Sequence, residues 1–443
     1  MQNETKPGES QPITVEVSHD GMRAFMVLPT AQTFVDEQAI LNALEAVGVC
    51  EGFARATEQQ SDAGEPREAG KPFLVALGQP ASEASIEFTP TFDTASAFEP
   101  ASFENNFHLL QRYATIRAGE PVAHMFVTRP PKNGLDVRGN EVTAPMTADE
   151  AVQARLGEGV TYDADRSQVL ASACGYPYLD EEGRVCVRSQ FTIDGDVGLD
   201  WEHFSVFGNL SVNGNIREKL VISITGDLTV HGDVDDVTIT VDGNATIDGD
   251  ILNCRAGGLH ATGNVSFISA DNALVVCAGK IHFREHAQFC KLIAGKGVFG
   301  DEAGSSIVGG LVQSGEHVEV AVLGNAGAIG TEIEITISPY IKEKMLALTK
   351  KLATLRENPR DNAALIAQLS EQLSDYENQL EDQINQTLMG DVVVPRHIIA
   401  FKKVFGGTYL RILKKSRTVV DELEKVSFSI VDGELIADSF HTD

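Results

Sequence analysis

The sequence predicts a mainly β protein built around a right-handed parallel β-helix. Three observations predict this fold. Glycine-led segments recur along the middle of the 443-residue chain, apolar and polar residues alternate within them, and Gly-Asp or Gly-Asn pairs mark their corners. Self-similarity at a period of 16–20 residues is typical of a solenoid, whose coils bury their apolar faces only against neighbouring coils.

The repeat is defined by its glycines. They open successive segments at Gly208, Gly226, Gly243, Gly263, Gly279, Gly295 and Gly315. After most of them the alternation has a period of two, which predicts a strand with one buried face, and a second apolar run predicts at least two strands per repeat. We expect these side chains to point inward: Val212, Leu228, Val230, Ile247, Val265 and Ile281. Glycine reaches positive φ without penalty and Asn or Asp tolerates the left-handed region, so the pairs predict tight corners.

A left-handed hexapeptide helix is the alternative architecture. Its coils are close to a strict multiple of six residues. The coil length here varies between 16 and 20 residues, and the six-residue spacing fades after Gly249. The variation favours the right-handed β-helix.

Four regions follow from the pattern. A mixed α+β region is predicted over residues 1–185, with a polar loop at about 54–72. It begins with two strands around the turn at His19-Asp20-Gly21, followed by an amphipathic helix with apolar residues at 40, 41, 44 and 47. The β-helix is predicted over 186–337, an antiparallel coiled-coil helical hairpin over 338–390 and a small β segment over 391–443.

The hairpin interrupts the β pattern with heptad spacing. Ser338 is the expected N-cap and Pro339 the first helical residue. One apolar seam runs through Ile341, Met345, Leu348, Leu352 and Leu355; a second runs through Ile366, Leu369, Leu373, Tyr376, Leu380, Ile384 and Leu388. Pro359 ends the first helix and Gly390 the second. The candidate partner-binding residues are Leu373, Tyr376, Leu380, Ile384 and Leu388; a self-contained hairpin is the equally supported alternative.

Charge and composition exclude several functions. The net charge of −29 argues against general binding to nucleic acid or to an anionic membrane. The sequence has no secretion signal and no apolar run of membrane-spanning length, which favours the cytoplasm. Six cysteines without a CxxC pair predict reduced, mostly buried thiols. We expect no catalytic residue, cofactor or metal site, and interpret the repeat carboxylates as solvated corner residues: Asp194, Asp196, Asp227, Asp233, Asp248 and Asp250.

Several stretches resemble the bacterial flagellar assembly protein A family, in the same order over nearly the whole chain. They include "LEAVGVCEGF", "RAGEPVAH", "NGLDVRGNEV", the Gly-Asx coils, the helical hairpin and "KKVFGGTYLRI". The resemblance marks Gly134, Asp136, Val137, Gly139 and Asn140, the coil glycines Gly309 and Gly310, and Gly406 and Gly407. This chain has Gly-Gly at 406–407, where the family typically has Pro-Gly.

The resemblance implies a cytoplasmic protein of flagellar assembly with no known catalytic residue. With the sequence features, it predicts a non-enzymatic scaffold or localisation factor that contacts proteins of the flagellar or cell-pole apparatus, or a cytosolic regulator. Recruitment to the pole and self-association are left open, and nucleic acid and direct membrane insertion are not expected. The alternatives are a polymerising, bactofilin-like scaffold and, less favoured, a carbohydrate-active β-helix enzyme.

Overall fold

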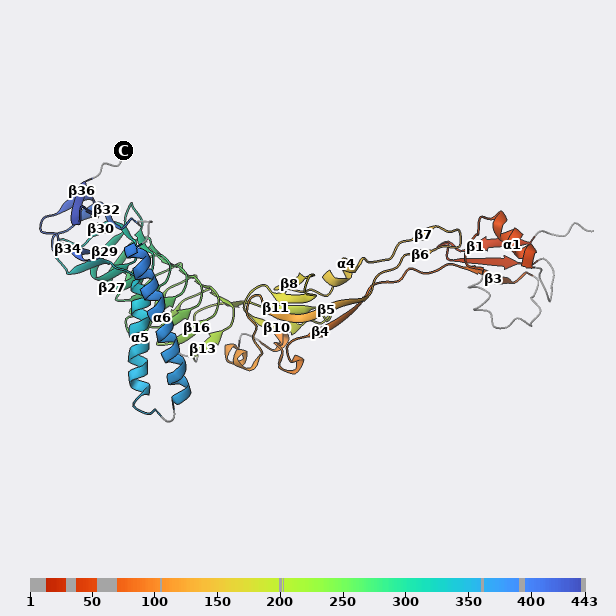
Figure 1. Ribbon diagram of the computed structural model, residues 1–443, viewed down its shortest axis with the longest axis horizontal. Helices are drawn as coiled ribbons and strands as arrows, with labels where there is room; N and C mark the ends of the chain where they lie inside the picture. The colour runs from red at the N-terminus through yellow and green to blue at the C-terminus, as the bar shows by residue number, and fades with distance from the viewer. Residues whose placement is uncertain are drawn as a thin grey trace, which may run out of the picture. The chain divides into compact units, whose positions relative to one another are not determined.

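The computed structural model describes residues 13–28, 37–53, 70–103, 106–198, 201, 203–359, 362–389 and 395–439 (Figure 1). The chain forms two compact units. The first comprises Met1–Thr91, Pro121–Leu170 and Leu179–Val185, and the second Phe92–Glu120, Ala171–Tyr178 and Cys186–Asp443. The predicted polar loop lies mostly outside the described residues. Along the described chain, no helix combines the length and the apolar character that crossing a bilayer requires.

The first unit begins with the predicted strand pair and helix. Strands β1 (Thr14–Val17), β2 (Arg23–Val27) and β3 (Pro72–Leu77) form an antiparallel sheet, and α1 (Glu37–Ala46) packs on it. Buried apolar side chains from the sheet and helix make one small core. They are Ala24, Met26, Leu28, Ile40, Leu44, Val49, Val75, Ala76 and Val137.

A second antiparallel sheet of the first unit has the order β4-β5-β9-β8. Its strands are β4 (Ser85–Pro90), β5 (Pro121–Arg129), β8 (Val160–Asp163) and β9 (Gln168–Ala171). The short helix α4 (Ala148–Gln153) begins with a capping box, in which Thr147 and Glu150 each bond the other's backbone N–H.

The second unit contains a parallel β-solenoid of about eight turns, as the repeat predicts. Each early coil has three strands, so the solenoid has three faces. Face 1 is β12 (Gln190–Ile193), β14 (Asn209–Val212), β17 (Leu228–Val230), β20 (Ala245–Ile247), β23 (Val265–Phe267), β26 (Ile281–Phe283), β28 (Gly297–Gly300) and β30 (His317–Leu323). Face 2 is β15 (Ile216–Arg217), β18 (Val234–Asp235), β21 (Ile251–Leu252), β24 (Ala270–Asp271) and the first parts of β27 (His286–Ala294) and β29 (Ser306–Ser314). Face 3 is β13 (Phe204–Val206), β16 (Val221–Ile224), β19 (Thr238–Val241), β22 (Gly258–Ala261), β25 (Leu274–Cys277), the last parts of β27 and β29, and β31 (Thr331–Ile335).

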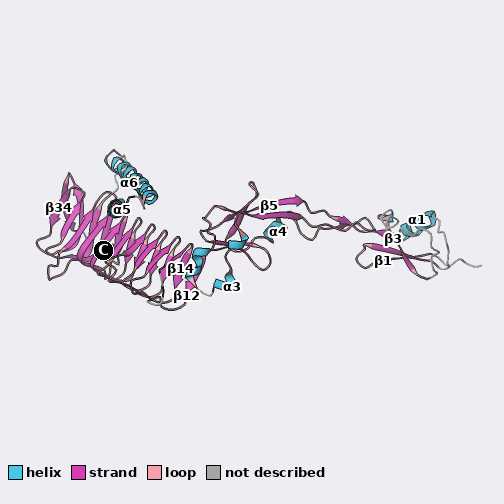
Figure 2. Ribbon diagram, turned by 90° about the horizontal axis from the view of Figure 1, so that it is seen from below, coloured by secondary structure: helices cyan, strands magenta, loops and turns pink. Residues whose placement is uncertain are grey.

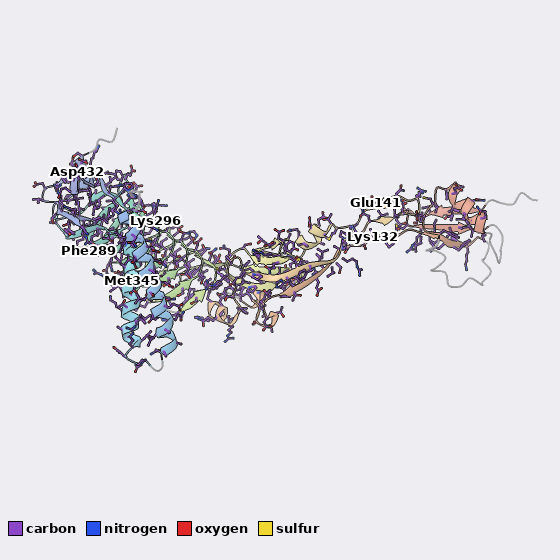
Figure 3. The ribbon with its side chains drawn as sticks, in the orientation of Figure 1. Lys132, Glu141, Phe289, Lys296, Met345 and Asp432 are labelled. Carbon is purple, nitrogen blue, oxygen red and sulfur yellow. The ribbon has the colours of Figure 1, made fainter. Side chains whose placement is uncertain are left out.

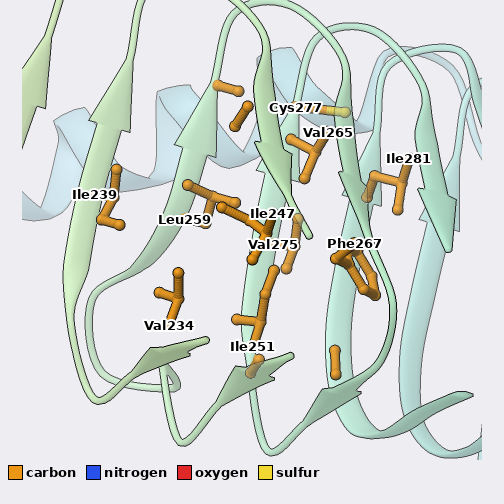
Figure 4. Close-up of a cluster of buried hydrophobic side chains, with 14 of the residues drawn as sticks. Val234, Ile239, Ile247, Ile251, Leu259, Val265, Phe267, Val275, Cys277 and Ile281 are labelled. Carbon is orange, nitrogen blue, oxygen red and sulfur yellow. The ribbon is translucent and has the colours of Figure 1, made fainter. Parts of the chain in front are cut away.

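The coils stack in register, so equivalent side chains lie above one another in the core (Figure 4). All six side chains predicted to point inward do so, with exposures of 0–2%. Parallel pairing at a period of two places alternate residues inside, and each coil supplies a floor for the next.

The corners correct one part of the sequence interpretation. Positive φ was expected at the Gly-Asx pairs, but Gly226, Gly243 and Gly263 have none. The glycine is needed for space instead. A Cβ built on Gly243 would lie 2.4 Å from Oδ1 of Asp227 and 2.7 Å from the carbonyl oxygen of Gly226, far inside van der Waals contact.

The Asx side chain occupies that space because it bonds the next coil. Asp227 N–H donates to Oδ1 of Asn209 (2.7 Å), Asn244 N–H to Oδ1 of Asp227 (2.7 Å), and Asn264 N–H to Oδ1 of Asn244 (2.9 Å). A second ladder at another corner joins Asp196, Asn215, Asp233 and Asp250 in the same way. The carboxylates and amides of these two ladders therefore satisfy backbone donors where the strands begin.

Left-handed backbone lies at the corner between faces 2 and 3. Its residues are Asp236, Asn253, Asn272, Phe289 and Gly309, with φ between 50° and 71°. Asn and Asp tolerate this region, whereas a bulky residue such as Phe289 rarely adopts it.

The N-terminal end of the solenoid is covered by aromatic rings. The 3₁₀ helix η2 (Phe107–Arg112) contacts β13, and Phe107 lies 5.3 Å from Phe204 between ring centroids. The other rings of this cluster are Phe98, Phe103, Tyr113, Tyr176, Tyr178, Phe191 and Trp201. Short elements near the cluster are η1 (Thr94–Ser96), α3 (Pro100–Phe103), β10 (Tyr176–Leu179) and β11 (Val185–Arg188).

The other end is closed by a change of strand direction. Strand β32 (His397–Val404) adds to β30 in parallel, but its other edge pairs antiparallel with β35 (Leu423–Val431). Likewise β33 (Tyr409–Ile412) adds to β31 in parallel and then pairs antiparallel with β34 (Lys415–Thr418); β36 (Glu434–Ser439) follows β35. The stack thus stops in hairpins, which hide open coil edges.

Helices α5 (Pro339–Leu355) and α6 (Ala363–Met389) form the predicted antiparallel hairpin and stand on one side of the solenoid (Figures 1 and 2). Pro339 is at the start of α5, as expected. The prediction that the Ser338 side chain caps α5 is wrong. Ser338 has a left-handed backbone, and its hydroxyl donates to Oε1 of Gln383 on α6. The hydroxyl therefore ties the two helices together at the base of the hairpin.

Candidate functional site

The hairpin covers part of face 3. Outward-pointing side chains of this face form one register: Ser223, Thr240, His260, Val276, Ile293, Gln313 and Glu334. Ser223 and Thr240 are exposed, whereas Val276 and Ile293 have no exposed surface although they lie outside the solenoid core. Since α5 contacts β27, the apolar stretch of the register coincides with the helix that covers it.

Charged and polar groups fix the hairpin to this face. Lys291 Nζ lies 2.9 Å from Oε2 of Glu343 on α5. Burial raises the pKa of Tyr340 to about 12, and burial lowers the pKa of Lys344, whose ammonium lies 5.4 Å from the Tyr340 ring centroid. His260, beneath the hairpin, bonds the Gly257 carbonyl oxygen, and its burial lowers its pKa.

A cleft of about 400 Å³ with a mixed polar and apolar lining lies where the hairpin leaves the solenoid. Lys296, Glu316 and Arg396 line it from the solenoid side (Figure 3 labels Lys296), and Gln379 and Gln386 line it from α6. Burial lowers the pKa of the Arg396 guanidinium, whose Nε bonds the Gly315 carbonyl oxygen at 3.3 Å. Amides and charges of both signs suit a peptide or protein surface with hydrogen-bonding groups.

The candidate partner-binding residues lie along α6. Leu373, Tyr376, Leu380 and Ile384 are half-buried, and the Leu388 side chain is outside the described residues. Leu369, on the same seam, is buried, as is Leu352 on α5. The hairpin's large exposed apolar side chains in the described region are instead Leu346 and Leu365. Partner binding by the α6 seam stays a prediction.

The family-marked loop at 134–140 belongs to the first unit and connects β6 (Gly134–Leu135) and β7 (Glu141–Val142). Asp136 Oδ1 accepts the backbone N–H groups of Arg138 and Asn140, and Oδ2 accepts the Asn140 amide. These bonds contribute to lowering the pKa of Asp136. Gly139 has φ of 80°, and Val137 is fully buried in the small core. The loop therefore has a structural role: Asp136 holds its turn, and Val137 fills part of the small core.

The other marked glycines are also explained by backbone geometry. Gly309 and Gly310 both have positive φ, and a Cβ on Gly310 would lie 2.1 Å from the Cys290 carbonyl oxygen. Gly407 has φ of 86°, and a Cβ on Gly406 would lie 2.5 Å from the Val420 carbonyl oxygen. All four sit at turns of the late coils or the closing hairpins.

The reactive side chains are placed in structural environments. Burial raises the pKa of Cys254 to about 11, of Cys277 to about 12 and of Cys290 to about 11, so these thiols stay protonated at neutral pH. All six cysteines are free. His282 stacks on Phe299, and His231 bonds Asp248 at 2.7 Å.

The structure brings together three side chains for which the sequence predicted no common site: His317, Glu319 and His397. The one available signal was the His-x-Glu spacing, which puts two side chains on the same face of a strand. His397 is 80 residues away from His317, and only the strand pairing shows that they are neighbours.

Comparisons with known proteins point to one family. A family model described as "Flagellar Assembly Protein A beta solenoid domain" matches residues 189–435, and one described as "Flagellar Assembly Protein A N-terminal region" matches residues 13–182. Neither the curated proteins nor the solved structures contain a match.

Proposed function

Because this chain belongs to the Flagellar Assembly Protein A family, we propose that it serves flagellar assembly as a non-catalytic scaffold or localisation factor that works through protein–protein contacts. The family is one of flagellar assembly proteins and is not a known enzyme family. The proposed setting is the cytoplasm, with recruitment to the cell pole. The proposed partners are proteins of the flagellar or polar apparatus, or a cytosolic regulator.

One observation carries the proposal: the helical hairpin stands on the solenoid and exposes apolar side chains at its surface. Leu346 on α5 is 47% exposed and Leu365 on α6 is 37% exposed, whereas the seams of both helices are buried or half-buried. A surface of this kind can hold a partner without moving the body beneath it. The cleft at the base of the hairpin adds hydrogen-bonding groups beside it.

The polymerising alternative has less support. A filament of solenoids needs bare coil edges at both ends so that one molecule can continue the next. In this chain the aromatic cluster lies against the first coils and antiparallel hairpins follow the last. These ends favour a discrete scaffold over a filament.

A matched variant is designed to remove the hairpin while keeping the solenoid soluble. Replacing residues 339–389 by a Gly-Ser link bares Val276 and Ile293, so the matched variant also carries Val276→Thr and Ile293→Thr, the kind of residue that uncovered coils have at these positions. We expect the link variant alone to aggregate and the matched variant to stay folded and β-rich by circular dichroism.

The test is complementation of a deletion strain. We expect deletion to reduce flagellar number and swimming, the full chain to restore both, and the matched hairpin-less variant to fail at normal protein level. Leu346→Gln with Leu365→Gln should weaken complementation, whereas Val420→Gln, at an 83% exposed site in the closing hairpins, should not. Normal flagella in the deletion strain would contradict a role in flagellar assembly. Full rescue by the hairpin-less variant would show that the hairpin is not needed for that role.

A further inference from the structure

Two histidines and a glutamate converge on the outer surface of face 1, at the last coil. His317 and Glu319 lie two residues apart on β30 and so project from the same side of the strand. β32 pairs with β30 in parallel, with His397 directly beside His317. The two imidazole centroids are 4.3 Å apart, and His397 Nε2 lies 2.7 Å from Oε1 of Glu319.

The distances match a mononuclear metal site. One ligand atom from each residue can be chosen so that no two are more than 4.8 Å apart. Tetrahedral Zn²⁺ with bonds of about 2.0–2.1 Å requires ligand atoms about 3.3 Å apart. This spacing lies between the 2.7 Å contact of His397 with Glu319 and the upper limit of 4.8 Å for the three atoms. All three side chains are half-buried, so none is enclosed by the core.

The immediate surroundings also suit a cation. The Nδ1 atom of His317 is buried and has no hydrogen-bond partner among the described residues, so the ring has an unused bonding site. Glu316 places a second carboxylate 3.9 Å from His317 Nε2 and adds negative charge. Two imidazoles and a carboxylate form a donor set that binds Zn²⁺ and related divalent ions and leaves a further coordination position open.

We propose that His317, Glu319 and His397 bind one divalent transition-metal ion, with Zn²⁺ as the best match, and that the ion fastens β32 to β30. The two strands are separated in sequence by β31 and the whole hairpin. The ion therefore links the last solenoid coil to the first strand after the hairpin, next to the residues Glu316 and Arg396 that line the cleft. Metal binding would stiffen the base from which the hairpin projects.

The experiment uses the full-length chain, stripped with EDTA and exchanged into chelator-free buffer. Zn²⁺ is titrated by calorimetry, and Co²⁺ by its visible absorption, which reports coordination geometry. We expect one ion per chain and a higher melting temperature with Zn²⁺, because an ion bound only by the folded state stabilises it. His317→Gln, Glu319→Gln and His397→Gln should each weaken Zn²⁺ binding about tenfold or more and reduce the thermal shift.

Matched variants assign the site. His231→Gln removes an exposed histidine that is likewise bonded to a carboxylate, and Cys50→Ser removes the exposed thiol; both should leave binding unchanged. Glu319→Gln keeps the size of the side chain, so a normal circular dichroism spectrum separates lost ligation from misfolding. The proposal is overturned if the wild type binds no Zn²⁺ more tightly than about 100 µM, if a triple variant keeps the stoichiometry, or if Cys50→Ser abolishes it.

Discussion

The solenoid coils before Gly279 and those after it are held at their corners by different groups. The early coils have three short strands and Gly-Asx corners, where each side-chain oxygen accepts a backbone N–H from the next coil. In the late coils β27 and β29 bend through two faces without a break, and the Asx ladder ends at Lys280 N–H. Where the two groups of coils meet, Val276 of the last early coil and Ile293 of the first late coil lie on the outside, beneath α5.

The difference shows that one architecture can be stabilised locally or by an added element. The first coils satisfy their corner donors with their own neighbours and leave Ser223 and Thr240 uncovered on face 3. Ile293 in a late coil and Val276 in the coil just before it form an apolar surface that the hairpin covers, so the stability of these coils and the placement of the hairpin depend on each other. Five predictions test this comparison, from the largest expected effect to the smallest.

Both regions should depend equally on the core. Leu228→Ala in an early coil and Leu292→Ala in a late coil each leave a cavity at a site with at most 1% exposure. We expect each to lower the free energy of unfolding by about 2–4 kcal/mol in urea titrations. A Leu228→Ala variant with an unchanged midpoint would contradict the strand register.

The early corners should not tolerate a Cβ. Gly243→Ala must push against Asp227 Oδ1 and a backbone carbonyl, which should cost about 1–3 kcal/mol of stability. Gly304→Ala is the control, because no atom lies within 4 Å of its added Cβ. It should leave the stability nearly unchanged when both variants are compared by thermal unfolding. The double variant Asp227→Ala with Gly243→Ala should lose less stability than the sum of the two single losses, because Asp227→Ala removes the oxygen that the added Cβ meets. Simple additivity of the two changes would contradict the steric explanation.

The ladder of Asx side chains at the early corners should depend on the side-chain oxygen that accepts the backbone N–H and not on a carboxylate charge. Asp227→Ala leaves the Asn244 N–H without its acceptor and should cost about 1–2 kcal/mol. Asp227→Asn keeps an amide oxygen there, so we expect a change below about 0.5 kcal/mol by denaturant titration. A large effect of Asp227→Asn would point to a role for the carboxylate charge.

The hairpin contact should weaken at high pH. The folded state raises the pKa of Tyr340 from 10.0 to about 12, so the folded chain holds this proton where the unfolded chain has lost it. The contribution of Tyr340 is complete below pH 10 and is lost as the pH rises toward about 12. Unfolding followed between pH 9 and 12 should show a shallower decline for Tyr340→Phe than for the wild type; equal slopes would show that Tyr340 is not buried against the face.

The smallest effect concerns the corner between faces 2 and 3. Phe289 has φ of 50° where the preceding coils have Asn272, Asn253 and Asp236. Phe289→Asn should relieve left-handed strain and raise stability by about 0.5–1 kcal/mol, since the ring is already 43% exposed. Asn272→Phe is the reciprocal change and should lower the melting temperature.

The sequence by itself determined the features that depend on local periodicity. Alternation placed Val212, Leu228 and the other inward residues correctly, because a strand has a period of two whatever lies around it. Heptad spacing located α5 and α6, and Pro339 marked where α5 begins. Each of these signals is contained within a few consecutive residues.

Only the tertiary structure decided what depends on the neighbouring coil. The corner glycines are required because an oxygen from one coil earlier fills their Cβ space, and no single repeat contains that information. Val276 and Ile293 look like ordinary strand residues until α5 is seen to contact β27. The cluster of His317, Glu319 and His397 exists because β32 returns beside β30 after the hairpin, and strand register over such a separation is set by packing and not by local pattern.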